Sequence, residues 1–389
     1  MKRPSVQILL QNPANPAPFK TDDIIQGEDI FTPHRETRVE CINISFQAEN
    51  LENHIPLTRN VLRRTFLQVN FPIDEYLSKA VLESQQTHKI PFHFVVPSHI
   101  PVQMCHHDCA NLGIYQEHLQ LPPSLGNISQ YFRRSDDMSP AEAEVKYSIK
   151  FSIIEKLSKA NWPKTLKETI YPVYILPRRL EAAPLLIDSS CKFYQLRTKK
   201  SLTKGVLRSK IGSMTLSSFQ SPGIDLRDGP WTKHDHETST NVRINLRFEP
   251  QYEDQLETPP RIISSDTKLK IMTFFGVQPW DEFPNISSPS SWSPRQTYWS
   301  ESIHLSSENY LIDWVPQRNS HSGCPGVYYT VTIDIPAVLP DDRVYSPTFH
   351  SCFISRTYSL KTTIHYRDHG KARKQSSASL NIPVQLYVS

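Results

Sequence analysis

The chain has 389 residues, enough for two domains of ordinary size, and its 43 Lys and Arg against 39 Asp and Glu give a formal net charge of +4. So small an excess of positive charge disfavours a nucleic-acid-binding protein, which neutralises many phosphates. With 11 Gly and 32 Pro, the composition favours an all-β fold over a doubly wound nucleotide-binding fold, because the latter needs Gly in its phosphate loops.

No targeting or membrane-spanning segment is visible in the sequence. After the basic residues 2–3, the apolar stretch runs only from Ile8 to Leu10, which is too short for the apolar region of a signal peptide. Nowhere do about 18 apolar residues follow one another, the length that spans a bilayer. The 6 Cys are scattered rather than spaced as a disulfide framework. We therefore expect a cytoplasmic protein with free thiols and no transmembrane segment.

Short apolar runs with a period of two recur along the chain and are typical of sandwich strands with one face in water. In residues 39–46, this period places Ile42, Ile44 and Phe46 on one face and Val39 on the other. Residues 145–153 show the clearest alternation, with Val, Tyr, Ile and Phe between Lys and Ser. The other predicted strands are residues 91–96, 171–176, 242–248, 268–275, 327–335, 358–366 and 382–388.

Helical signals are few. Residues 72–76 are turn-like, and residues 139–144 could begin a single turn. Because helices do not separate the strands, a parallel α/β sheet is disfavoured. Pro and Ser predict a long loop over residues 281–300, and we expect a break between two halves near residues 184–190.

Several segments together resemble the fungal branch of the arrestin-like family. Residues 23–30 and 39–46 are similar to the family's opening pair of strands, in which a Gly interrupts the hairpin-like start. Residues 90–97 (IPFHFVVP) resemble the Pro-Phe-x-Phe-x-(Val/Leu)-Pro strand of arrestin N-terminal domains, and residues 121–126 resemble a loop that follows it. In the second half the similar segments are residues 242–248, 268–271 and 347–360. The resemblance covers almost the whole chain.

The resemblance implies an all-β fold of two tandem immunoglobulin-like (arrestin-like) β-sandwiches, residues 1–184 and residues 185–389. It further implies an adaptor or scaffold, not an enzyme, that binds membrane-protein cargo and recruits a HECT-type ubiquitin ligase in endocytosis or protein transport. Peripheral contact with a membrane is compatible with this role. We therefore expect no nucleic acid, no cofactor and no catalytic residue.

Adaptors of this kind usually carry a Pro-Pro-x-Tyr motif, whose extended segment docks in the aromatic groove of a WW domain. Here residues 122–123 are Pro-Pro followed by Ser-Leu, and residues 259–260 are Pro-Pro followed by Arg-Ile. The nearest approach, residues 250–252, lacks the first Pro. The sequence therefore favours a scaffold that recruits a ligase indirectly, with a sorting-coat subunit without a ligase as the alternative.

Residues 105–109 (CHHDC) have the C-x₃-C spacing of half a zinc site. The sequence shows no second pair of ligands with such a spacing, although His99, His118 or Cys191 could supply further ligands. We favour a loop with incidental His and thiols, and we expect no metal. The sequence also lacks a G-x-S-x-G elbow, a Gly-rich phosphate loop and an H-E-x-x-H motif, which argues against an enzyme.

Positive charge is concentrated at the start of the second half, at Lys199, Lys200, Lys204, Arg208 and Lys210. An anionic partner, either phospholipid headgroups or an acidic cargo tail, could bind these side chains. The alternative is the solvated face of an ordinary strand. We favour the strand face, because the interleaved Leu202, Val206 and Ile211 have the pattern of packing positions.

Four tryptophans, Trp280, Trp292, Trp299 and Trp314, lie around the predicted Pro/Ser-rich loop. If exposed, they could form a platform for sugar stacking or for a protein partner. If buried, they are core and loop anchors, which we favour. A carbohydrate-binding β-sandwich is therefore a third hypothesis, and the lack of a visible signal peptide counts against it.

Overall fold

The fold is nearly all β. The structure, a computed structural model, describes residues 5–11, 18–52, 62–73, 81–126, 136–155, 164–182, 185, 187, 191, 193–204, 209–226, 238–251, 258–286, 292–318, 327–367 and 375–389. These residues form strands β1 to β20, one α-helix and one 3-10 turn. The predicted all-β class is confirmed.

The strands of the first half form two antiparallel sheets. One has the order β1-β2-β6, from β1 (Ser5–Leu10), β2 (Ile24–Thr32) and β6 (His88–Val95). The other has the order β4-β3-β7-β8, from β4 (Leu62–Asn70), β3 (Thr37–Glu52), β7 (Ala143–Glu155) and β8 (Lys164–Val173), with β5 (Val81–Leu82) added to β3. Along β7, buried and half-buried side chains alternate over the whole strand, as predicted for residues 145–153.

The strands of the second half form two larger antiparallel sheets and a short parallel pair. The first sheet has the order β15-β16-β12-β10-β9, from β15 (Val315–Arg318), β16 (Val327–Val338), β12 (Ser239–Pro250), β10 (Ser209–Ser218) and β9 (Arg197–Lys204). The second has the order β14-β13-β18-β17, from β14 (Gln296–Asn309), β13 (Arg261–Gly276), β18 (Ile354–Arg367) and β17 (Phe349–His350), with β19 (Gln375–Val384) paired to β18. The parallel pair is β11 (Ile224–Asp225) and β20 (Leu386–Tyr387).

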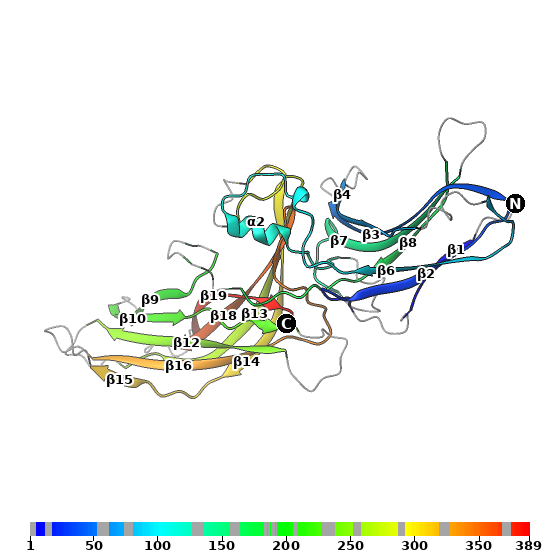
Figure 1. Ribbon diagram of the computed structural model, residues 1–389. Coiled ribbons are helices and arrows are strands. Elements are labelled where there is room, and N and C mark those ends of the chain that lie inside the picture. Colours follow the sequence, from blue (N-terminus) through cyan, green and yellow to red (C-terminus); the bar gives the residue numbers. More distant parts are fainter. Residues whose placement is uncertain are drawn as a thin grey trace.

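The two groups of strands lie side by side and meet at a junction, near which α2 (Leu112–Leu119) is located (Figure 1). Among the described residues, every strand ladder joins strands of the same group. The predicted boundary falls between the groups; residue 184 itself lies outside the described residues, and the division into two domains stays a prediction.

Each of the two larger hydrophobic cores takes side chains from the other half. Phe275, Phe349 and Ile354 pack with the core of the first group, which includes Phe46 and Phe151. In the opposite direction, the core of the second group includes Met138, Tyr174 and Leu176 from the first half. The junction is therefore held by shared apolar packing as well as by chain connectivity.

Two local predictions were wrong, and one element was missed. Val39 faces the core with 4% exposure, because a bulge between residues 39 and 41 shifts the register of β3 against β7. Strand β14 already begins at Gln296, inside the predicted loop 281–300. Helix α2 was not predicted, although Asn111 caps it by accepting a hydrogen bond from the Ile114 amide at 3.1 Å.

The described cysteines are free thiols, as predicted: Cys41, Cys105, Cys109, Cys191 and Cys352. No helix in the described part of the chain has the length and apolar character needed to cross a bilayer.

Candidate functional site

The candidate site lies at the junction, where the irregular segment between β6 and α2 meets the turn between β17 and β18. This segment contains a 3-10 turn, η1 (Val102–Met104), and continues into α2, which contacts β17. The Ala110 amide donates to the Asp281 carbonyl at 2.9 Å, so that the segment is also fastened to the loop after β13. Elements from both halves of the sequence therefore build the site.

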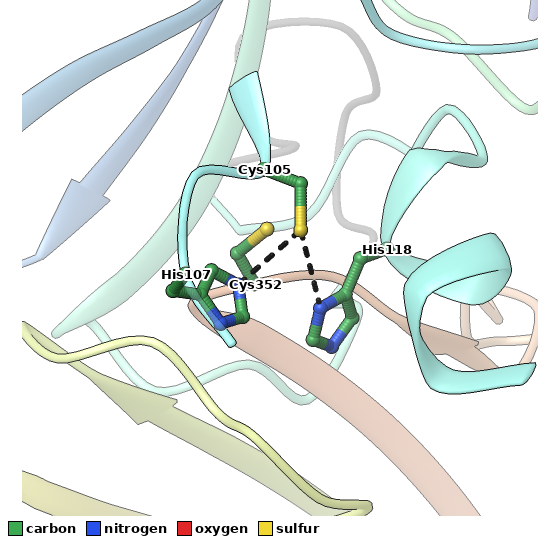
Figure 2. Close-up of side chains that lie close together, drawn as sticks. All are labelled: Cys105, His107, His118 and Cys352. Carbon is green, nitrogen blue, oxygen red and sulfur yellow. Dashed lines mark hydrogen bonds between the residues drawn. The ribbon is translucent and has the colours of Figure 1, made fainter. Parts of the chain in front are cut away.

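A cluster of two thiols and two imidazoles occupies this junction: Cys105, His107, His118 and Cys352 (Figure 2). Their four ligand atoms, one from each residue, all lie within 4.8 Å of one another. Cys105 Sγ lies 3.4 Å from His107 Nε2 and 3.9 Å from His118 Nδ1. Cys105, His118 and Cys352 are buried, with 7%, 1% and 5% exposure, and His107 is half-buried. These are residues that could hold a metal ion.

A fifth group of the same kind lies beside the cluster. Cys109 Sγ is 3.9 Å from Cys105 Sγ and 3.6 Å from His118 Nδ1. It is half-buried and outside the set in which all four ligand atoms are mutually close.

The turn that carries Cys352 is fixed by local hydrogen bonds. The Ser351 hydroxyl donates to the Ile354 carbonyl at 2.6 Å and accepts from the Ile354 amide at 3.2 Å. The Trp280 amide donates to the Cys352 carbonyl at 2.8 Å. The backbone of Cys352 is thus held in place independently of its thiol.

Burial controls the charge of the cluster. It lowers the pKa of His118 to about 4, with the neighbouring His107 as the second cause. It raises the pKa of the Cys109 thiol to about 11, and it raises that of the Cys352 thiol far above its ordinary value; in both cases Cys105 adds to the shift. On their own, these three groups are therefore uncharged at neutral pH.

Sequence reasoning named three of the four cluster residues as candidates and missed the fourth, Cys352. It singled out the C-x₃-C segment and named His118 among three residues that could supply further ligands. His99 instead bonds its neighbour Ser98 at 2.8 Å. Cys352, the missing partner, is brought in by tertiary folding. No spacing in the sequence relates Cys352 to Cys105, because the two lie in different halves of the chain.

Next to the cluster, a buried ion pair fastens α2 to the segment that leaves the first half. Arg179 Nη1 lies 3.2 Å from Glu117 Oε2, and it also donates to the Thr348 carbonyl at 3.3 Å. The Arg179 side chain is only 7% exposed, and burial lowers its pKa. The backbone of Arg179 exchanges two hydrogen bonds of 2.9 Å with Val388. The two halves are therefore joined by polar contacts as well.

A second buried arginine, Arg356, also joins the two halves. Arg356 is fully buried in β18, and its guanidinium donates to the carbonyls of Asp137 and Met138 and to the Ser139 hydroxyl. Sequence reasoning did not single out Arg356, because an arginine in a strand is ordinarily exposed.

The predicted basic residues that the structure describes lie in the edge strand β9 and at the start of β10. Lys199, Lys200 and Lys210 are exposed, and Lys199 Nζ lies 3.3 Å from Glu249 Oε2. Lys204 ends β9, and Arg208 lies outside the described residues. Adjacent side chains of a strand point to opposite faces, so Lys199 and Lys200 do not share one surface.

Two residues interleaved with these basic positions are core residues. Leu202 has 1% exposure and Ile211 has 5% exposure, whereas Val206 lies outside the described residues. The packing role predicted for Leu202 and Ile211 is confirmed.

The four tryptophans do not share one exposed platform. Trp280 is buried with 3% exposure and packs edge-on against Trp292, with the ring centroids 5.4 Å apart. Trp314 is half-buried and donates to the Pro260 carbonyl at 2.9 Å. Trp299 is 49% exposed. The predicted burial therefore holds for Trp280 and is wrong for Trp299.

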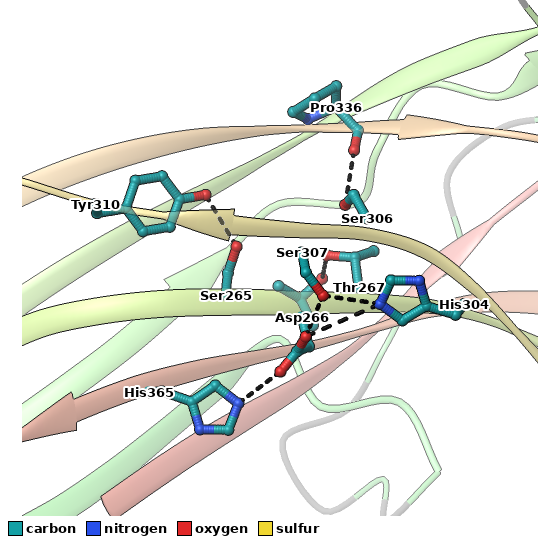
Figure 3. Close-up of polar contacts among 10 residues, drawn as sticks. Ser265, Asp266, Thr267, His304, Ser306, Ser307, Tyr310, Pro336 and His365 are labelled. Atoms are coloured by element: carbon teal, nitrogen blue, oxygen red, sulfur yellow. Dashed lines mark hydrogen bonds and ion pairs between the residues drawn. The ribbon is translucent and has the colours of Figure 1, made fainter. Parts of the chain in front are cut away.

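A polar cluster on β13, β14 and β18 resembles a catalytic triad only in its residue types (Figure 3). Asp266 accepts from His365 Nε2 at 2.7 Å and from the Ser307 hydroxyl at 2.5 Å. His304 uses one atom, Nε2, for both Ser307 at 2.9 Å and Asp266 at 3.9 Å. In a triad the carboxylate orients the second ring nitrogen of the base, which this arrangement does not provide.

No known protein-family model matches the chain, and none of the curated proteins compared with it matches.

Proposed function

We propose that this protein is a cytoplasmic arrestin-like scaffold, which binds membrane-protein cargo through its surfaces and catalyses no reaction. In this proposal, residues 1–184 and 185–389 are two tandem immunoglobulin-like β-sandwiches. The observation that carries it is the pairing of the described strands, which join only within each half while the two cores share side chains across the junction. Such an arrangement suits a rigid two-part binding surface.

The segments that resemble the arrestin-like family support this proposal by their positions. Residues 23–30 and 90–97 contribute to the neighbouring strands β2 and β6, in which Gly27 pairs with Phe92. A Cβ atom at Gly27 would collide with the Leu9 carbonyl and with the Phe92 ring, so the close approach of the strands requires glycine here. Residues 347–360 include β17, the start of β18, and both Cys352 and Arg356.

The diproline segments favour indirect recruitment of a ubiquitin ligase, or none. Pro122 and Pro123 are buried, and the Pro122 carbonyl accepts from the Tyr147 hydroxyl at 2.5 Å. Pro260 is buried, and its carbonyl accepts from Trp314. A WW domain binds an exposed polyproline segment, so these sites are unsuited to it. This observation favours the second candidate function, a sorting-coat subunit that acts without a ligase.

Proximity labelling in fungal cells tests the proposal. We expect a labelling enzyme fused to the full chain to mark integral membrane proteins more strongly than the same enzyme expressed alone. If neither membrane proteins nor a ligase are enriched over this control, the proposal is wrong.

Deletion of the gene separates the two candidate functions. Reduced ubiquitination of the labelled cargo indicates the adaptor function. Unchanged ubiquitination together with missorting of the cargo indicates the sorting-coat function.

A further inference from the structure

We propose that Cys105, His107, His118 and Cys352 bind one zinc ion, which ties α2 and the segment before it to the turn between β17 and β18. This site would stabilise the junction of the two halves. It does not depend on the scaffold function proposed above, because it follows from the geometry of four side chains.

The ligand types suit zinc. Two thiolates and two imidazoles form a Cys₂His₂ set, one of the common structural zinc sites. All four side chains are buried or half-buried, so the site is closed as structural sites are. Oxygen-binding cations such as Mg²⁺ and Ca²⁺ are disfavoured, because the set contains no carboxylate.

The distances also suit a tetrahedral ion. With Zn–S of about 2.3 Å and Zn–N of about 2.0 Å, tetrahedral geometry separates a ligand sulfur from a ligand nitrogen by about 3.5 Å. Cys105 Sγ lies 3.4 Å from His107 Nε2 and 3.9 Å from His118 Nδ1. The largest separation within the set is no more than 4.8 Å. Closure around zinc therefore requires side-chain shifts of about 1 Å or less, which rotamer adjustments supply.

A second contact orients one imidazole for metal binding. His107 Nδ1 lies 3.0 Å from the Asp108 carbonyl, which can only accept a hydrogen bond, so Nδ1 carries the proton. Nε2, which faces Cys105, is then the unprotonated nitrogen that a metal requires.

Charge balance favours binding in this buried position. As zinc binds, the two S–H protons of Cys105 and Cys352 leave to solvent, and two Zn–S bonds form. A divalent ion with two thiolates and two neutral imidazoles carries no net charge. The complex therefore adds no charge beside the buried Arg179.

An alternative assignment would use Cys109 as the fourth ligand instead of His107. Cys109 Sγ is 3.6 Å from His118 Nδ1 and 3.9 Å from Cys105 Sγ. We assign His107 because its ligand atom belongs to the mutually close set. The Cys109→Ser variant separates the two assignments.

Elemental analysis of the full chain, purified under reducing conditions without a histidine tag, tests the proposal. We expect about one zinc per chain, and at least a tenfold lower content in the double variant Cys105→Ser, Cys352→Ser. Cys41→Ser is the matched control, since Cys41 is a free thiol on β3 that is not a member of the cluster, and it should retain the ion. Cys109→Ser should also retain it, whereas His107→Ala should lose it.

A measurement on the unaltered chain guards against variants that fail to fold. Cobalt(II) added to the metal-free protein should give the intense visible bands of a tetrahedral site and the near-ultraviolet band of thiolate-to-cobalt charge transfer. A wild-type chain that carries no zinc and takes up neither zinc nor cobalt overturns the proposal. Loss of zinc from Cys109→Ser with retention in His107→Ala overturns the assignment of His107.

Discussion

Arg356 and Ser139 are joined by a hydrogen bond of 3.0 Å from the Arg356 Nη1 atom to the Ser139 hydroxyl, although they lie in different halves of the chain. The Nη2 atom donates to the carbonyls of Asp137 and Met138 at 2.6 Å and 2.9 Å. Arg356 is 0% exposed, and these acceptors are neutral oxygens. Stabilisation of the buried guanidinium therefore depends on the first-half loop staying docked on β18.

Replacing this arginine should destabilise the protein. Arg356→Met keeps much of the side-chain volume but removes three hydrogen bonds and leaves buried carbonyls without their donor. We expect a loss of about 3 kcal/mol in the free energy of unfolding, measured by urea denaturation. The control is Arg243→Met, which removes an exposed ion pair with Asp334 and should leave the urea midpoint nearly unchanged. Equal midpoints for the two variants would contradict the role of Arg356.

A buried carboxyl should make stability fall as pH rises. Asp29 is 0% exposed between Ile8 and Ile90 on the neighbouring strands, and its carboxyl oxygens have no hydrogen-bond partner in the described part of the chain. Burial raises its pKa from 3.8 to about 7. Between about pH 4 and pH 7 the folded state therefore holds a proton that the unfolded state releases. The stability contributed at low pH is lost as pH rises through 7.

The variant Asp29→Asn should remove this dependence. We expect wild type and variant to be similar near pH 4, where both side chains are neutral, and the variant to be more stable near pH 8 by about 2 to 4 kcal/mol. Urea denaturation at several pH values across this range measures the difference in the free energy of unfolding. Glu28→Gln is the adjacent control, because Glu28 is 43% exposed and its substitution should keep the wild-type dependence. A variant that keeps the wild-type profile would refute the assignment to Asp29.

The polar cluster on β13, β14 and β18 should change stability with pH in the opposite direction, and weakly. The Ser307 hydroxyl, followed by His365, lowers the pKa of Asp266 below 3.8. Its stabilisation is therefore present above the unfolded-state pKa and is lost as pH falls through the lower folded-state value. Because the carboxylate is 40% exposed, Asp266→Asn should cost less than about 1 kcal/mol at neutral pH.

This cost should shrink as the pH falls through the lowered folded-state pKa of Asp266, because the carboxyl is then protonated in both states. Urea midpoints at neutral and acid pH measure the loss of stability caused by Asp266→Asn. Asp313→Asn, at an exposed position, is the control. A difference between Asp266→Asn and wild type that grows on acidification would contradict this assignment.

Removing the proposed zinc ion should lower thermal stability. A strong chelator such as EDTA takes away an ion that binds only the folded state, so we expect the melting temperature to fall by about 5 to 10 °C. Zinc should restore it, and magnesium should not. The double variant Cys105→Ser, Cys352→Ser should melt at the same temperature with and without chelator. If the chelator lowered the melting temperature of the wild type and of the double variant equally, it would be acting at a site other than this cluster.

Much of the fold could be predicted because burial alternates between neighbouring residues of a β-strand. This alternation is visible in the sequence as a period of two in apolar side chains. Along β7 the period of two in the sequence became alternating burial, and Leu202 and Ile211 were correctly assigned to the core. Val39 was misplaced because a bulge breaks that period without a signal in composition. Helix α2 was missed because it has only eight residues, and its capping Asn111 lies among other loop-forming residues.

By itself the sequence determined the all-β class, the course of most strands, the thiol-rich segment at residues 105–109 and the absence of a Pro-Pro-x-Tyr motif. Tertiary structure alone decided that Cys352 joins Cys105 and His118, and that Arg356 is buried against a loop of the other half. The physical reason is the separation along the sequence of the residues that determine each feature. Strand periodicity is a property of consecutive residues, whereas a junction is formed by side chains whose meeting depends on how whole sheets pack.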